Sequence, residues 1–99
     1  MNIYHITPLK VWREALEMGS YDAESLEKEG FIHCCTKVQI ETVLKEWFEG
    51  VTDLLLLEID PKLLSTGVKY EDSKGTGELF PHIYGPLNLE AVIKVTICA

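Results

Sequence analysis

The sequence predicts a single α+β domain: a small mixed or antiparallel sheet sandwich with two main helices. Its 99 residues are the length of one ordinary domain. Apolar residues recur at helical spacing in Pro8–Met18 and in Ile40–Phe48. Short apolar or alternating runs, typical of strands, surround these segments: Ile3–Ile6, Phe31–Cys34, Leu54–Ile59, Val68–Glu71 and Ala91–Cys98. The resulting order, β-α-β-α-β-β-β, is typical of an α+β fold.

The first predicted strand leads directly into the first predicted helix. Thr7 before Pro8 is the pattern of a helix N-cap followed by proline at the first helical position. Trp12 falls on the apolar face, and Gly19 is a typical helix stop. The next segment, Ser20–Gly30, is rich in turn residues, with one helical turn expected at Ser25–Lys28.

The second predicted helix begins with a capping box. Thr36 and Gln39 have the required spacing, in which each side chain bonds to the other residue's backbone N–H. The apolar positions that follow place Trp47 and Phe48 in the core, and Gly50 ends the pattern.

The carboxyl-terminal half is expected to be mostly strand. The continuous apolar run Leu54–Ile59 predicts a central strand covered on both faces. The residues 72–78 include two glycines, a serine and a threonine, which favours a mobile loop. Two prolines mark Leu79–Leu87 as a structured loop, and Ala91–Cys98 closes the sheet.

Charge and cysteine usage exclude several classes of protein. The net charge is −7, and Arg13 is the single arginine, so we expect no extended nucleic-acid partner. The amino terminus lacks the basic and apolar regions of a signal peptide, and no apolar run is long enough to cross a membrane. Three cysteines without metal-site spacing favour free thiols in a reducing compartment. We therefore expect a cytoplasmic protein.

All three histidines lie in predicted strands or structured loops. His5 and His33 follow apolar residues in short strands, and His82 lies in Phe80–Pro86, a segment crowded with rings and prolines. Each alone is explained by a hydrogen bond at a sheet edge. One shared cleft accounts for the three together, and imidazoles suit such a site because they change charge near neutral pH.

For the other candidate site residues, a purely structural role is an alternative to a role in ligand binding or catalysis. Glu71 ends a strand and is either a solvated carboxylate or an acid that contacts ligand. Thr7 and Gln39 are either helix-capping residues or cleft residues. Cys34 follows His33 directly, so its side chain should point to the opposite face, which disfavours a Cys–His nucleophile.

The sequence resembles the bacterial domain-of-unknown-function family 952 almost from end to end. The resemblance is carried by these segments: Tyr4-His5-Ile6-Thr7-Pro8, Trp12, Gly19-Ser20-Tyr21, Ser25-Leu26, Glu29-Gly30-Phe31-Ile32-His33-Cys34, Gln39, Leu57-x-Ile59-Asp60, Glu71 and Phe80-Pro81-His82-Ile83-Tyr84-Gly85-Pro86-Leu87. Cys35 departs from the family, which commonly has serine there.

The resemblance implies a relationship to the ADP-ribosyltransferase superfamily, which includes RNA 2′-phosphotransferases. His5 is similar to the superfamily's first-strand histidine, which holds a ribose hydroxyl of nicotinamide adenine dinucleotide (NAD). On this basis NAD is the expected substrate, and a carboxylate and stacking aromatics would stabilise an oxocarbenium-like state. The expected catalytic residues are His5, His33, Glu71 and His82. The expected ligand-binding residues are Thr7, Ser25, Gln39, Phe80 and Tyr84.

Three classes of function remain open at this point. The first is a nucleotide- or NAD-binding pocket with transferase-like chemistry. The second is a non-catalytic module that binds a small ligand or a partner in the same cleft. The third is a metal site made of the histidines and Glu71, but no histidine pair has helical spacing, so we expect no metal.

Overall fold

Residues 1–99 are described by a computed structural model, in which three small antiparallel sheets surround one core. The largest sheet has the strand order β1 (Ile3–Pro8), β4 (Leu54–Ile59), β8 (Val92–Ile97). β4 is therefore the central strand, as predicted, and Leu57 and Ile59 are completely buried. The α+β class with antiparallel sheets and few helices is confirmed.

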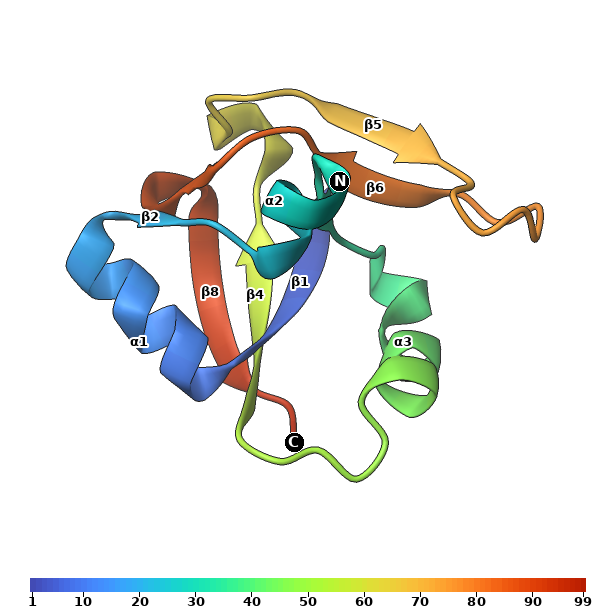
Figure 1. The fold of residues 1–99 in the computed structure, drawn as a ribbon, viewed down its shortest axis with the longest axis horizontal. Coiled ribbons are helices and arrows are strands. Elements are labelled where there is room, and N and C mark those ends of the chain that lie inside the picture. The colour runs from blue at the N-terminus through green and yellow to red at the C-terminus, as the bar shows by residue number, and fades with distance from the viewer.

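Helix α1 (Leu9–Met18) packs beside this sheet and buries Trp12 and Ala15 (Figure 1). It ends as predicted, because Gly19 takes the left-handed conformation at φ 87°. The predicted cap at Thr7 is wrong. Pro8 is the residue before the first helical turn, and Thr7 stays in β1, paired with Leu55. Its fully buried side chain has another partner, described below.

The turn-rich segment contains two elements instead of one turn. The short strand β2 (Ser20–Tyr21) pairs with β7 (Leu87–Asn88), and helix α2 (Glu24–Glu29) includes the expected turn. Neither two-residue strand was predicted, because such a strand leaves no periodicity in the sequence.

The third sheet has the order β3 (Ile32–His33), β6 (Phe80–Ile83), β5 (Val68–Glu71). The prediction of a loop at Leu79–Leu87 is wrong for Phe80–Ile83. Proline normally argues against a central strand, but the Pro81 carbonyl still accepts a hydrogen bond from the Cys34 N–H at 3.0 Å. A bridge between Tyr4 and Cys35 joins this sheet to the free edge of β1.

Helix α3 (Ile40–Trp47) follows a 3-10 turn at Lys37–Gln39 and lies beyond β1, at one side of the molecule (Figure 1). The predicted helix exists, but the prediction that Trp47 and Phe48 belong to the core is wrong. No residue of α3 is buried, Trp47 is 61% exposed, and Phe48 is only half-buried. The apolar face of α3 instead borders a pocket.

Two further 3-10 turns, Pro61–Leu63 and Leu89–Ala91, connect strands. The core consists of apolar side chains from all three sheets and α1, with Ile32, Ile83 and Leu87 completely buried beside the β4 residues. No helix is long and apolar enough to span a membrane.

Candidate functional site

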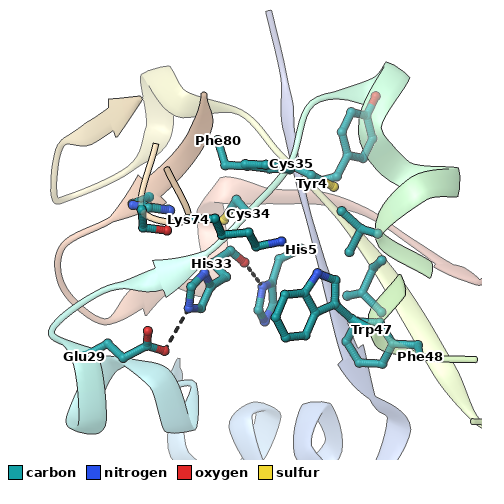
Figure 2. A pocket seen from close by; sticks show the side chains of 14 residues that line it. Tyr4, His5, Glu29, His33, Cys34, Cys35, Trp47, Phe48, Lys74 and Phe80 are labelled. Atoms are coloured by element: carbon teal, nitrogen blue, oxygen red, sulfur yellow. Dashed lines mark hydrogen bonds and ion pairs between the residues drawn. The ribbon is translucent and has the colours of Figure 1, made fainter. Parts of the chain in front are cut away.

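A pocket of about 410 Å³ lies where the free edge of β1 meets β3 and β6, with α3 forming the opposite wall (Figure 2). Its volume falls within the range of small-molecule sites, about 300–1,000 Å³. The lining comes from β1, α2, β3, α3 and β6, from the residues just after β3 and α3, and from the β5–β6 loop: Tyr4, His5, Ile6, Glu29, His33, Cys34, Cys35, Val43, Trp47, Phe48, Ser73, Lys74, Phe80 and His82.

The three histidines, predicted to share a cleft, all line this pocket. The rings of His33 and His82 are neighbours on adjacent strands, with centroids 5.4 Å apart. His5 reaches the same region from β1, and its Nδ1 lies 2.5 Å from the His33 carbonyl oxygen. The geometry of each histidine differs, and so does the chemistry it can perform.

His5 is a buried, neutral member of a closed hydrogen-bond network. Burial lowers its pKa to about 4, so the ring is uncharged at neutral pH. A carbonyl can only accept, so Nδ1 carries the proton and donates to His33. Nε2, 2.7 Å from the Tyr21 hydroxyl, therefore accepts from it. The Thr7 hydroxyl, 2.9 Å from the Tyr21 oxygen, completes the chain. Both nitrogens of His5 are thus engaged within the protein.

Tyr21 is the joint of this network, so Tyr21→Phe is expected to destabilise the protein. The substitution leaves the buried Nε2 of His5 and the Thr7 hydroxyl without their partner, which costs about 1–3 kcal/mol. Urea unfolding at pH 7 measures the loss. Tyr70→Phe, at a tyrosine that is 48% exposed, is the matched control. Equal stability of Tyr21→Phe and the native protein would contradict the assigned network.

His33 is the exposed histidine of the pocket. Its Nε2 lies 2.8 Å from Glu29 Oε2, and the two side chains are about half exposed, at 46% and 51%. Gly30, in the left-handed conformation at φ 87°, ends α2 after Glu29 and allows the chain to reverse into β3. This chain reversal brings the Glu29 carboxylate within hydrogen-bond distance of the His33 imidazole.

His82 is 1% exposed, and its two nitrogens have different surroundings. Nδ1 lies 2.9 Å from Glu71 Oε1, while Nε2 is buried with no hydrogen-bond partner. The ring stacks on Phe31, with centroids 4.0 Å apart and planes tilted by 17°. The carboxylate acceptor requires the proton on Nδ1, so in the neutral ring Nε2 offers an unused lone pair.

Glu71 is bonded to His82 and does not line the pocket. Its carboxylate accepts hydrogen bonds from the Tyr84 hydroxyl and from His82, and these bonds lower its pKa below the ordinary value. The same contact raises the pKa of Tyr84. Neither Glu71 nor Tyr84 is among the lining residues. Glu71 is therefore placed as a positioning residue for the imidazole.

The mouth of the pocket is crossed by Lys74, from the loop that was predicted to be mobile. Its Nζ lies 4.2 Å from the Trp47 ring centroid and 5.2 Å from that of Phe80 (Figure 2). The loop has internal order, because the Asp72 carboxylate accepts from the Thr76 and Gly77 N–H groups, which lowers the pKa of Asp72.

Gln39 connects this loop to the start of α3. Its Oε1 accepts from the Thr36 N–H at 2.9 Å, as the capping box predicted. Its Nε2 donates to Glu78 Oε2 and to the Leu79 carbonyl, each at 3.0 Å. Gln39 therefore supports the pocket from outside, since it does not line it.

The cysteines are free thiols. Cys34 and Cys35 are buried, and burial raises the pKa of both, that of Cys35 to about 12. A thiol with a raised pKa carries little thiolate and is a poor nucleophile. The sequence disfavoured a Cys34 nucleophile on a different ground, the direction of its side chain, but Cys34 and His33 both line the pocket.

Of the predicted ligand-binding residues, Phe80 alone lines the pocket. Thr7 is fully buried in the His5 network, and Ser25 lies half-buried on α2 with no recorded hydrogen bond. No group of three or more His, Cys, Asp or Glu side chains is placed where it could hold a metal ion. The histidine–Glu71 metal hypothesis thus has no ligand cluster to support it.

Sequence reasoning assigned four of the 14 lining residues to the site, and those it did not assign include Glu29, Trp47, Phe48 and Lys74. Trp47 and Phe48 had the correct helical period, but periodicity cannot tell a face that packs on the core from one that borders a pocket. Glu29 could have been found from its spacing of four residues before His33. Nothing in the sequence around Lys74 marks it.

The fold and the pocket together define an α+β domain with a histidine-lined, small-molecule-sized cavity. The family described as protein of unknown function DUF952 matches residues 6–95, so the chain belongs to this family. The chain is similar to protein CC0527 from Caulobacter crescentus. The match to its crystal structure has 31% identity and a TM-score of 0.88, and covers 98% of this chain and 85% of that one. The match to its solution NMR structure has 31% identity and a TM-score of 0.84, and covers 97% and 83%. No curated protein gives a significant match.

Proposed function

We propose that the protein binds a nucleotide or NAD-like ligand, with the ring-bearing end of the ligand held in the histidine-lined pocket. The observation that carries this proposal is one cavity of about 410 Å³ whose lining combines aromatic side chains with His82, a buried imidazole whose Nε2 has no hydrogen-bond partner. A planar heterocycle gains stacking on such walls. A small movement of the His82 ring would expose its Nε2 to an N–H or O–H group of the ligand. The volume suits a base or nicotinamide with its ribose better than a whole dinucleotide.

The histidines have separate roles in this proposal. His82, oriented by Glu71, is the hydrogen-bonding contact to the ligand. His33, half exposed beside Glu29, is the group at the rim. His5 holds the His33 backbone, because its own nitrogens are both bonded. The ribose contact that the superfamily resemblance implies for His5 would require displacement of Tyr21.

ADP-ribosyl or glycosyl transfer is the second candidate function, and the Glu71–His82 pair favours it. A carboxylate that fixes an imidazole with its other nitrogen free is the arrangement of a general base, which could activate an acceptor hydroxyl. The non-catalytic alternative is favoured by the position of Glu71, whose carboxylate does not line the pocket. RNA 2′-phosphotransfer is not part of the proposal, because the single arginine, Arg13, lies on α1 outside the pocket.

We also propose a cytoplasmic location, since three free thiols suit a reducing compartment.

Titration with NAD, ADP-ribose and nicotinamide, followed by NMR of the imidazole signals, tests binding. The expected result is a shift of the His33 and His82 signals with saturation. Unmoved signals at millimolar concentrations of all three compounds would refute the proposal. Release of free nicotinamide during long incubation with NAD separates turnover from binding alone.

Trp47→Leu is expected to weaken binding of the best ligand about tenfold, which corresponds to one lost aromatic stacking contact of about 1.4 kcal/mol. Trp47 is 61% exposed, so the variant should remain folded. Tyr70→Leu makes a similar change at an exposed aromatic residue outside the pocket and should bind normally. Calorimetric titration of the two variants measures the difference. Equal affinities would place the ligand elsewhere.

A further inference from the structure

The ammonium group of Lys74 rests on aromatic faces instead of on a carboxylate. It lies 4.2 Å from the Trp47 ring centroid and 5.2 Å from that of Phe80, within the range of cation–π attraction. The chain has 16 acidic residues, yet Lys74 makes no ion pair with any of them. The neighbouring acids of its own loop, Asp72 and Glu78, are bonded to the loop backbone and to Gln39.

Apart from Lys74, the pocket lining adds no lysine or arginine that would repel a cation. The net charge of the chain is −7, and Glu29 is the one carboxylate in the pocket lining. Lys74 is the one lysine or arginine there. The Trp47 ring that it covers is 61% exposed and has no packing role in the core. Trp47 lies on a helix without a buried residue, and together with Val43 and Phe48 it forms the α3 side of the pocket lining.

We propose that the mouth of the pocket is a binding site for a planar organic cation, such as an N-alkylpyridinium ring, and that Lys74 occupies this site in the free protein. The inference rests on the proposed function and specifies its ligand class. The cationic ring would stack on Trp47 and Phe80 where the ammonium now lies, since both are attracted by the negative faces of the aromatic rings.

His82 adds a second element of recognition in the same pocket. Its Nε2 is buried and has no partner, and in the neutral ring, whose single proton lies on Nδ1 and is donated to Glu71, Nε2 can only accept. A carboxamide N–H on the cationic ring would supply the missing donor once a small movement of the His82 ring exposes Nε2. Ligand recognition would therefore combine two contacts. Trp47 and Phe80 would bind the charged ring by cation–π attraction, and His82 would accept a hydrogen bond from one N–H group.

Lys74 must leave when such a ligand enters. It belongs to an exposed loop between β5 and β6, so its departure disturbs no buried contact. The loop would keep its fold, because the bonds to Asp72 and Gln39 do not involve the Lys74 side chain. Lys74 thus acts as an internal competitor that lowers the affinity of the pocket for the external cation.

The test compares two compounds of the same shape: 1-methylnicotinamide, which carries the ring charge, and 3-methylbenzamide, which is neutral. Both have the carboxamide for His82. We expect the cation to bind at least about fivefold more tightly to the native protein, the difference that a cation–π contact provides. Upfield ring-current shifts of the Lys74 side-chain protons should be seen in the free protein and be lost on binding.

Two variants complete the test. Lys74→Ala should tighten 1-methylnicotinamide binding about two- to fivefold, because the competing internal contact is gone. Lys69→Ala removes the same charge and a similar contact, 5.1 Å above the Tyr84 ring and outside the pocket, and should bind like the native protein. Equal binding of the two compounds, or weaker binding of the cation by Lys74→Ala, would overturn the cation site but leave the pocket proposal intact. Failure of both compounds to bind either protein, while ADP-ribose still shifts the histidine signals, would also overturn the cation site alone. Failure of NAD, ADP-ribose and nicotinamide as well would overturn both proposals.

Discussion

Acidification from pH 7 to pH 4 is expected to remove about 3 kcal/mol of folding free energy through His5 alone. In the unfolded chain this histidine takes up a proton near its ordinary pKa of 6.5, whereas in the folded protein burial lowers the pKa to about 4. Between these values the unfolded state binds more protons, so stability falls as the pH falls. Above about pH 7.5 the ring is neutral in both states and contributes no pH dependence.

The carboxylates act in the same direction at the lower end of this range. The pKa values of Glu71 and Asp72 are lowered by their hydrogen bonds, so the stability they provide is lost as these groups become protonated. His5→Asn separates the two effects. Asparagine can still donate to the His33 carbonyl but does not titrate. The variant should be less stable than the native protein at pH 7 and show a flatter stability profile between pH 6.5 and pH 4.

Urea unfolding at several pH values across this range provides the measurement. His33→Asn is the matched control, because that side chain is 46% exposed and is not enclosed in a buried network. It should retain most of the native pH dependence. If His5→Asn kept the full native slope, the acid sensitivity would have to arise from groups other than His5, and the closed network around its ring would be wrong.

Sequence periodicity located most of the fold because burial and backbone geometry leave regular traces. The run Leu54–Ile59 became the central strand β4, and Gly19 ended α1 in the left-handed conformation that glycine adopts at low cost. The strand β6 was missed because Pro81 argued against it. The Thr7 cap failed because β1 continues through Pro8 in pairing with β4, which leaves the threonine in the strand. At Thr7 and Pro81, strand pairing with a neighbouring strand outweighed the local backbone preference of the residue.

The candidate site was predicted only in part, for a related physical reason. Histidines are rare enough that three of them in strand-like segments suggested a shared cleft, and the structure brings all three to one pocket. The partners of each imidazole depend on contacts distant in sequence: Tyr21 for His5 and Glu71 for His82. The sequence shows that these residues are present, but it does not show which of them contact each other in the folded protein. Trp47 and Lys74 were missed because their contact joins a helix to a loop.

Leu57→Ala is expected to cost about 2–5 kcal/mol, which is a large part of the roughly 5–15 kcal/mol stability of a typical domain. Leu57 is completely buried in the central strand between β1 and β8, so the substitution opens a cavity that the sheets cannot easily close. Trp47→Ala removes a larger side chain, yet it should cost less than about 1 kcal/mol, because that ring is mostly exposed and loses chiefly its contact with Lys74.

Thermal or urea unfolding of the two variants in parallel measures this contrast. If Trp47→Ala lowered the free energy of unfolding as much as Leu57→Ala, Trp47 would be a core-packing residue. The proposal that the aromatic face of α3 contributes to ligand binding would then be wrong. The expected pattern, normal stability with weakened ligand binding, is what distinguishes a recognition residue from a packing residue. Trp47 separates the two kinds of residue most clearly, because its helical spacing predicted that it packs in the core, whereas its side chain is mostly exposed.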